Sequence, residues 1–127
     1  MIAVDTSALM AILLSEGPAA DCKGVLIAEE DVLISAGTLA ELLVVAGRRG
    51  VAVEAARLVD DLGFSVVPVT AVSARQIAEA YAEWGRGVHA AGLNLGDCFA
   101  YAVAKAEGCP LLYVGDDFAK TDVMSAL

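Results

Sequence analysis

Basic side chains are scarce in this sequence. Its 127 residues include 8 lysines and arginines against 17 aspartates and glutamates, which gives a formal net charge of −9. A surface with this excess repels polyanions over most of its area. The sequence is therefore not that of a basic protein that coats nucleic acid through general charge attraction.

Long apolar runs are absent as well. No unbroken apolar run exceeds seven residues, the length of residues 8–14, whereas a membrane-spanning helix needs about 18 or more. The first apolar stretch has no basic residue before it and contains Asp5, which is unlike a secretory signal. These features exclude an integral membrane protein and lead us to expect a cytoplasmic one.

Metal-binding and nucleophilic motifs based on cysteine or histidine are also missing. The three cysteines, Cys22, Cys98 and Cys109, form no C-x-x-C pair, and only one histidine is present. This pattern favours neither a disulfide framework nor a zinc site, and we expect the cysteines to be buried thiols. A G-x-S-x-G elbow and a P-loop are absent too, so no protein nucleophile is predicted.

Apolar residues are abundant, at 58% of the chain against roughly 45–50% in typical globular domains. The length fits one domain over residues 1–127. Short β-branched runs at residues 2–4, 32–34, 65–69 and 111–114 alternate with longer segments of helical pattern. This alternation predicts a three-layer α/β/α sandwich whose mainly parallel sheet has four or five strands, covered on both faces.

The helix between the third and fourth strands shows a start and a stop signal. The pattern Ser73-x-x-Gln76 predicts a capping box at its beginning, and Gly85 predicts its end. Tyr81 and Trp84 recur at the helical spacing of apolar residues. We therefore expect both aromatic rings in the core, where they would not stack on bases.

The next helix is predicted over residues 95–107, with Gly108 directly after its end. Before it lies the one long loop of the chain, residues 85–94, which is rich in glycine and contains Arg86 and His89. Glycine-rich loops are commonly mobile and often contain functional residues. We therefore expect a mobile loop and consider it a candidate for binding a phosphate.

Five acidic residues are predicted to gather at one edge of the sheet. Asp5 follows the first strand, while Asp116 and Asp117 follow the last. The carboxyl ends of parallel strands meet at one edge, where ligands usually bind. Asp97 lies in the first turn of the helix over residues 95–107, and Glu41 lies within an apolar helical segment.

Each acidic residue also has a purely structural interpretation. Asp5 could cap the helix that follows it, and Asp97 could be an ordinary first-turn acid. The pattern Thr38-x-x-Glu41 matches a capping box, and the adjacent pair after the last strand could be a turn. Only the combination of these acids distinguishes a metal site from the separate structural roles, because carboxylates from four segments repel one another unless a cation lies between them.

An all-oxygen ligand set favours Mg²⁺ or Mn²⁺ over zinc. Such a site suits phosphodiester hydrolysis, since the metal activates a water and neutralises phosphate oxygens. Two alternatives remain open at this point. The first is a phospho-acceptor domain of the receiver kind, which has a similar acidic pocket, and the second is a scaffold that binds without catalysis.

Several segments together resemble a known family. They are Ile-Ala-Val-Asp-Thr-Ser-Ala at residues 2–8, Thr-Leu-Ala-Glu at 38–41, Asn-Leu-Gly-Asp-Cys-Phe-Ala-Tyr-Ala at 94–102, and Leu-Tyr-Val-Gly-Asp-Asp-Phe at 112–118 with Thr121-Asp122. In these segments the chain resembles the PIN-domain ribonucleases, specifically the VapC toxins of bacterial toxin–antitoxin pairs. The resemblance covers essentially the whole chain and is most specific at residues 94–102.

The resemblance implies an endoribonuclease that depends on Mg²⁺ or Mn²⁺, forms a homodimer and is silenced by a cognate antitoxin. It implies a metal site formed by Asp5, Glu41, Asp97 and one acid of the adjacent pair, Asp116 or Asp117, with Asp116 preferred.

For RNA binding we expect contributions from Arg86, His89 and Asn94. The other basic pair, Arg48-Arg49, is interpreted as the charged end of a helix.

Overall fold

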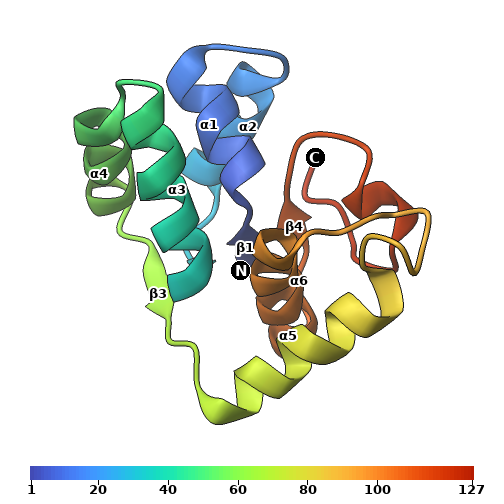
Figure 1. Cartoon of the computed structure of the whole chain (residues 1–127). Helices are drawn as coiled ribbons and strands as arrows, with labels where there is room; N and C mark the ends of the chain where they lie inside the picture. Colours follow the sequence, from blue (N-terminus) through green and yellow to red (C-terminus); the bar gives the residue numbers. More distant parts are fainter.

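A four-stranded parallel sheet of order β3-β2-β1-β4 lies at the centre of the computed structural model, which describes residues 1–127 (Figure 1). The strands are β1 (Ile2–Val4), β2 (Val32–Ser35), β3 (Ser65–Val67) and β4 (Leu111–Leu112). β1 pairs with β2 on one side and with β4 on the other. The predicted parallel α/β sheet is confirmed, with four strands.

Two strands are shorter than the apolar runs that predicted them. β3 ends before Pro68, which has no N–H to continue the ladder. The run after β4 continues to Val114, but the N–H of Val114 donates to the Ser7 hydroxyl at 3.0 Å instead of to a strand. In both cases the strand ends because a backbone N–H is missing or is bonded elsewhere, although the apolar side-chain pattern continues.

Six α-helices and one short 3₁₀ helix complete the chain. They are α1 (Thr6–Leu14), α2 (Ala19–Ala28), α3 (Ala36–Arg48), α4 (Ala52–Asp61), α5 (Ala71–Trp84), α6 (Leu95–Glu107) and η1 (Phe118–Lys120). The predicted bounds of α6 and its stop at Gly108 are confirmed. The predicted capping box of α5 is wrong, because Thr70 is the N-cap and Ser73 is its partner at the third helical position.

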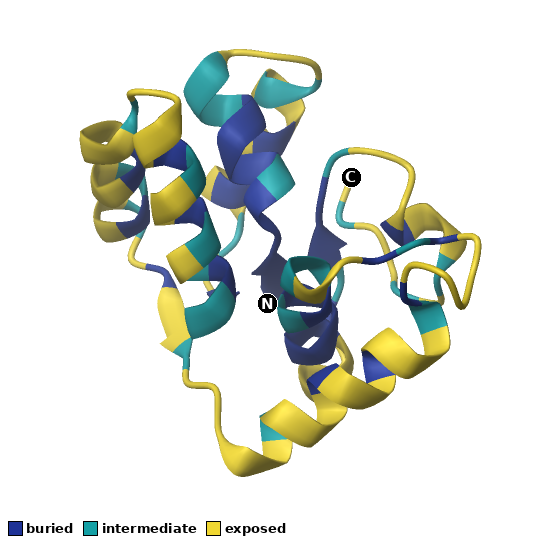
Figure 2. Cartoon of the chain, in the orientation of Figure 1, coloured by how far each residue is buried: buried dark blue, intermediate teal, exposed yellow.

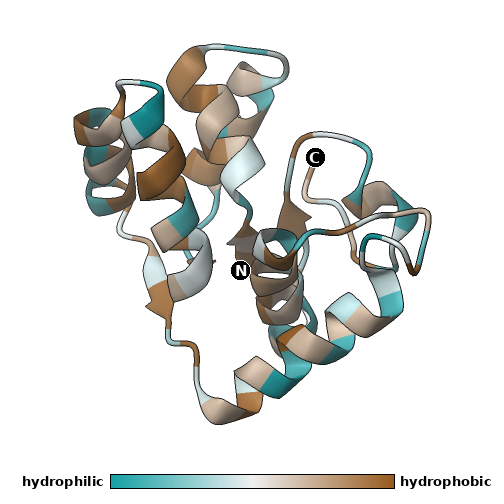
Figure 3. Cartoon of the chain, in the orientation of Figure 1, coloured by the Kyte–Doolittle hydropathy of each residue, from teal (hydrophilic) through white to brown (hydrophobic).

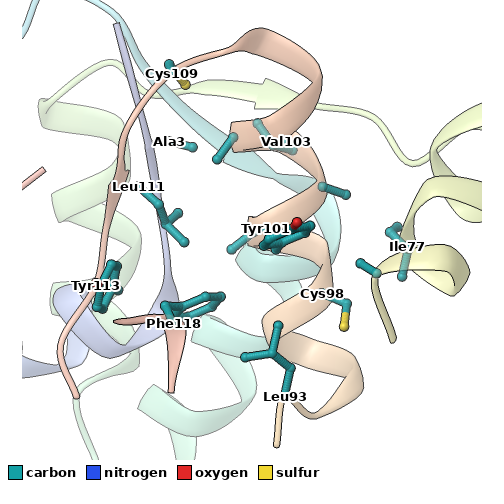
Figure 4. Packing of buried hydrophobic residues seen from close by; sticks show 14 of the residues in the cluster. Ala3, Ile77, Leu93, Cys98, Tyr101, Val103, Cys109, Leu111, Tyr113 and Phe118 are labelled. Atoms are coloured by element: carbon teal, nitrogen blue, oxygen red, sulfur yellow. The ribbon is translucent and has the colours of Figure 1, made fainter. Parts of the chain in front are cut away.

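Helices cover both faces of the sheet. Ala3, Leu33 and Leu111 belong to the buried cluster that also includes Tyr101 of α6 and Phe118, and Figure 4 shows Leu111 on the side of the sheet that faces Tyr101. The alternate strand residues join a second buried cluster with side chains of α1 to α4; they are Ile2, Val4, Val32, Ile34 and Leu112. The predicted three-layer α/β/α sandwich is therefore confirmed.

Other expectations about burial are tested by the same structure. The three cysteines are buried and free, as predicted. In α5 the inward positions belong to Ile77 and Ala80, whereas Tyr81 is 37% exposed, as Figure 2 shows for most of this helix. The expectation that Tyr81 lies in the core is wrong, because it sits on the flank of the buried stripe. No helix is both long and apolar enough to span a bilayer.

The loop over residues 85–94 has a defined internal structure. The N–H of Arg86 donates to the carbonyl of Leu93 at 3.0 Å, and the N–H of Leu93 donates to the carbonyl of Trp84 at 3.1 Å. The His89 ring packs edge-on against Trp84 with centroids 4.7 Å apart, and its Nδ1 accepts the N–H of Ala91 at 2.9 Å. These contacts close the loop at its two ends, and the mobility expected of this glycine-rich segment stays a prediction.

Candidate metal centre

Asp5 lies where the order of the sheet reverses. From β1 the chain moves outward to β2 and β3 on one side, and β4 is added last on the other side. The Asp5 N–H donates to the carbonyl of Leu112 at 2.9 Å, which fixes Asp5 beside the end of β4. Parallel α/β sheets bind ligands in the crevice at such a switch point. The crevice here begins with a carboxylate that is only 3% exposed.

The two carboxylate oxygens of Asp5 have different surroundings. Oδ2 accepts the N–H of Ser7 at 3.0 Å and its hydroxyl at 2.6 Å, so Asp5 does cap α1 as one interpretation predicted. Oδ1 is buried and has no hydrogen-bond partner. Burial raises the pKa of Asp5 to about 6; the Ser7 hydrogen bonds oppose this effect, and the charges of Asp97 and Glu41 add to it.

Ser7 is a residue that the sequence reasoning missed. Its hydroxyl donates to Asp5 and also accepts the N–H of Val114 from the segment after β4. One side chain thus connects the ends of β1 and β4 and fixes the rotamer of the buried carboxylate. The signal in the sequence was the Asp-x-Ser spacing of a helix cap, but the contact 107 residues away in the chain gives no local signal.

Asp97 lies at the same edge because α6 runs opposite to the strands. α6 leads directly into β4, so its first turn lies near the carboxyl ends of the strands. Asn94 and Asp97 form a reciprocal capping box, with backbone N–H contacts of 2.8 and 3.0 Å. Burial is the largest cause of the raised pKa of Asp97; Glu41 and Asp117 raise it further, and the Asn94 bond and Arg86 lower it.

Glu41 reaches this cluster because α3 and α6 approach closely. A Cβ atom on Gly96 would overlap Oε2 of Glu41, and one on Gly37 would overlap the ring of Phe99. Glycine at both positions therefore permits the approach. Figure 1 shows the beginning of α3 beside α6.

The alternative interpretation of Glu41, a capping box with Thr38, is not what the structure shows. α3 begins at Ala36 with Ser35 as its cap, whose hydroxyl accepts the N–H of Gly37 at 3.2 Å. Thr38 is fully buried in the first turn of α3, and its hydroxyl oxygen has no hydrogen-bond partner. The carboxylate of Glu41 is therefore not used to satisfy the start of the helix.

At the fourth acidic position the sequence analysis preferred Asp116, whereas the electrostatics of the site involve its neighbour Asp117. Asp116 and Asp117 are both exposed, and only Asp117 is among the groups that act on the pKa of Asp97. No three carboxylate, histidine or cysteine side chains form a complete metal cage in this arrangement. Two features nevertheless fit a cation: the unpartnered Oδ1 of Asp5 and the space above Gly96 that holds a Glu41 oxygen.

The three predicted RNA-binding residues are not placed together. Arg86 and Asn94 line one shallow cavity, with a volume of about 360 Å³. His89 is not part of its lining and packs against Trp84 instead. The pair Arg48-Arg49 ends α3 as predicted, and Arg49 lies 3.9 Å from Glu16 in an exposed ion pair.

Comparison with known proteins identifies the family to which the chain is similar. The PIN domain family profile matches residues 2–124. Ribonuclease VapC42 of Mycobacterium tuberculosis is 42% identical over 127 residues, which cover 97% of each chain.

Two solved structures share the fold. The first is Mycobacterium tuberculosis VapC20, described as a Sarcin-Ricin loop cleaving toxin, with a TM-score of 0.78, 23% identity and coverage of 98% of this chain and 97% of that one. The second is a toxin–antitoxin complex from Klebsiella pneumoniae, with a TM-score of 0.72, 22% identity and coverage of 100% and 98%.

The receiver-like alternative requires two adjacent acids after the first strand, whereas Asp5 stands alone after β1. The profile match over nearly the whole chain and the close relative point to a nuclease instead. The chain belongs to the PIN-domain family and, within it, to the VapC ribonucleases.

Proposed function

We propose that this chain is a Mg²⁺- or Mn²⁺-dependent endoribonuclease that hydrolyses RNA phosphodiester bonds as the toxin of a toxin–antitoxin pair. Residues 1–127 would act as one PIN domain. The observation that carries the proposal is the buried, unpartnered Oδ1 of Asp5, which belongs to a carboxyl group under the influence of Glu41 and Asp97. A buried anion of this kind is strongly disfavoured unless a cation compensates it.

The residues that would hold the metal are Asp5, Glu41 and Asp97, with Asp117 or Asp116 completing the set. Because every donor is a carboxylate oxygen, Mg²⁺ and Mn²⁺ suit the site better than zinc. When bound, the metal would supply an activated water and neutralise the charge that develops on the phosphate.

The protein's own residues orient these carboxylates. Ser7 fixes Asp5 through two hydrogen bonds, and Asn94 fixes Asp97 through the capping box at the start of α6. Arg86 lies close enough to Asp97 to lower its pKa, so a phosphate at the acidic edge would meet its guanidinium group. Preorganisation of this kind reduces the reorganisation required during the reaction.

The remaining RNA contacts that we propose come from Asn94 and His89. The Nδ1 atom of His89 is already an acceptor for the N–H of Ala91, which leaves Nε2 to donate toward a phosphate oxygen. His89 lies outside the cavity shared by Arg86 and Asn94, so its contact would fall on a neighbouring part of the RNA.

The direct test is cleavage of structured RNA in Mn²⁺, with and without EDTA. We expect cleavage that EDTA abolishes and that Asp97→Asn reduces by more than about a hundredfold, as for loss of a metal ligand. Asp60→Asn, at an exposed position of α4, is the matched control and should cleave as the parent protein does. Cleavage by Asp97→Asn at the parental rate would show that the site is wrongly assigned.

An antitoxin partner is supported by the similarity to a toxin–antitoxin complex and by the net charge of −9. A cationic peptide would be attracted to the acidic edge, and one of its basic side chains would block metal or phosphate there. This association should weaken as salt rises. A complex that leaves cleavage unaffected and contacts only surfaces remote from Asp5 and Asp97 would contradict the mode of inhibition.

A homodimer is supported by the apolar side chains left exposed on α3 and α4. Leu43, Val44 and Val53 are 41%, 56% and 58% exposed, and Figure 3 shows hydrophobic residues along the middle of α3. Light scattering at tens of micromolar would give the mass directly, and a monomer there would contradict the dimer. A cytoplasmic location fits an enzyme that acts on RNA.

A further inference from the structure

The shallow cavity beside the acidic cluster combines apolar and polar side chains. It is lined by Tyr81, Arg86, Asn94 and Leu95 and has a volume of about 360 Å³, within the usual range for pockets that bind small molecules. Tyr81 and Leu95 are 37% and 58% exposed, so the cavity offers an apolar wall that nothing in the chain covers. Arg86 and Asn94 provide its polar side.

One part of the Tyr81 ring lies against the backbone of Gly85, and the rest of the side chain has no partner in the protein. A Cβ on Gly85 would contact its ring atoms at 3.0 and 3.1 Å, which shows that the ring lies against the backbone of Gly85. Its hydroxyl makes no hydrogen bond within the protein, and its ring pairs with no other aromatic ring. A tyrosine held in this way costs little entropy to order and presents one face for stacking.

Arg86 and Asn94 both retain unused donors. The Arg86 guanidinium is in no ion pair, while its backbone is fixed by the hydrogen bond to Leu93. Asn94 accepts the N–H of Asp97 through Oδ1, which leaves both hydrogens of Nδ2 available. The cavity thus offers an aromatic face, a bidentate cation and an amide donor next to Asp97.

We propose that this cavity is a subsite for one unpaired nucleotide of the RNA, adjoining the acidic centre. The base stacks on Tyr81 beside Leu95, the phosphate binds Arg86, and Asn94 donates to the base edge or the ribose. This proposal rests on the proposed ribonuclease function and extends it to the form of the substrate. A base has to leave its helix to stack on a side chain, so the subsite selects single-stranded or looped RNA.

The same chemistry argues against a peptide as the occupant. A cationic segment is attracted to the acidic edge as a whole but would find no partner inside this cavity, where the unpaired guanidinium of Arg86 faces it, and an acidic segment would be repelled by Asp97 and its neighbours. A nucleotide joins a planar ring to an anionic group that a divalent cation at the acidic edge can share. Of these classes of ligand, only a nucleotide matches the Tyr81 ring, the Arg86 guanidinium and the neighbouring carboxylates together.

The test measures binding and cleavage separately. Binding is followed in Mn²⁺ by fluorescence anisotropy of a short labelled single-stranded RNA of mixed sequence with hydrolysis-resistant linkages, and of the same RNA as a duplex. Tyr81→Ala should weaken single-strand binding about tenfold, whereas Tyr81→Phe keeps the stacking face and should stay within about twofold of the parent. Arg86→Ala should weaken binding and also flatten its dependence on salt.

Val72→Ala is the matched control, since Val72 is an exposed side chain of the same helix, 62% exposed, away from this cavity. The parent and the variants are then compared for cleavage in Mn²⁺, where Tyr81→Ala should raise KM more than it lowers kcat. Circular dichroism checks that each variant is folded.

The possible outcomes distinguish failure of the proposed subsite from failure of the proposed ribonuclease function. Metal-dependent cleavage by the parent with unchanged binding and KM in Tyr81→Ala would overturn the subsite and leave the ribonuclease. Tyr81-dependent binding without any Mn²⁺-dependent cleavage would support the subsite and overturn the ribonuclease. A parent protein that prefers the duplex, or binds neither RNA, would overturn the proposed selection of an unpaired nucleotide.

Discussion

Replacing Asp5 by asparagine should raise the stability of the metal-free protein while abolishing its cleavage of RNA. The carboxylate is 3% exposed, and its pKa is raised from 3.8 to about 6. A rise of this size corresponds to about 3 kcal/mol of unfavourable free energy when the group is ionised in the folded, metal-free protein. Asp5→Asn removes this cost but leaves the buried amide nitrogen in place of Oδ1 without an acceptor, which costs at least about 1 kcal/mol.

The net expectation for Asp5→Asn without metal is a stability gain of about 1 to 2 kcal/mol at pH 7.5, or a rise in Tm of roughly 5 °C. The gain has a defined pH dependence. Since the folded pKa of Asp5 lies above its unfolded value, the folded state binds the proton more tightly, and the penalty on the parent is fully present above about pH 6. It decreases as the pH falls toward 3.8, so the advantage of the variant should shrink there as well.

Metal should reverse the order of the two proteins. A ligand that binds only the folded state stabilises it by about 2.7 kcal/mol at a hundred times Kd. The parent should therefore gain stability in Mn²⁺ while Asp5→Asn gains little and does not cleave RNA. Asp60→Asn removes an exposed charge from α4 and controls for the change in net charge.

The assay for Asp5→Asn is thermal unfolding followed by circular dichroism in EDTA and in Mn²⁺, at pH 7.5 and at pH 4.5. Two results would refute the reasoning. One is a metal-free Asp5→Asn variant that is no more stable than the parent at pH 7.5. The other is a stability difference that does not change with pH, because it would show that the buried charge is not the cause.

Three further substitutions test how the site is held. Gly96→Ala should displace the flexible carboxylate of Glu41 and reduce cleavage by about tenfold or more, with a change in unfolding free energy below about 1 kcal/mol; unchanged cleavage would contradict the role of this close approach. Ser7→Ala removes two hydrogen bonds, so it should cost about 1 to 3 kcal/mol in urea unfolding and raise the pKa of Asp5 further. Tyr101→Phe leaves the indole N–H of the single tryptophan without its 2.9 Å acceptor, so it should cost about 1 to 2 kcal/mol and change the tryptophan fluorescence.

The architecture was predictable because its signals are local. β1 and the whole of α6 follow from apolar pattern and glycine stops, and their bounds are confirmed. The third strand was predicted two residues too long because apolar character continues past Pro68, while strand pairing needs a backbone N–H. Tyr81 was misplaced for a related reason. Periodicity alone does not separate the centre of a buried helix stripe from its flank.

The acidic cluster was only partly predictable. Strand ends identify Asp5 and the pair after β4, since their position depends on topology that the pattern already implies. Glu41 depends on how closely two helices approach, which is determined by glycines at positions 37 and 96 and has no periodic signal. Ser7 depends on a hydrogen bond between residues 107 positions apart. Such contacts become visible only once the packing is known.

The excess of acidic charge and the proposed RNA substrate are compatible when local charges are considered. Two of the basic side chains, Arg49 and Lys105, are in ion pairs with carboxylates, whereas Arg86 is unpaired and acts on the acidic centre. A protein with a net charge of −9 gains little from general attraction to phosphates, so the proposed RNA binding would have to rest on divalent metal and the few contacts around Arg86. The same field attracts a cationic inhibitor from any direction. The charge would thus make RNA binding dependent on a local fit and make association with a basic partner rapid.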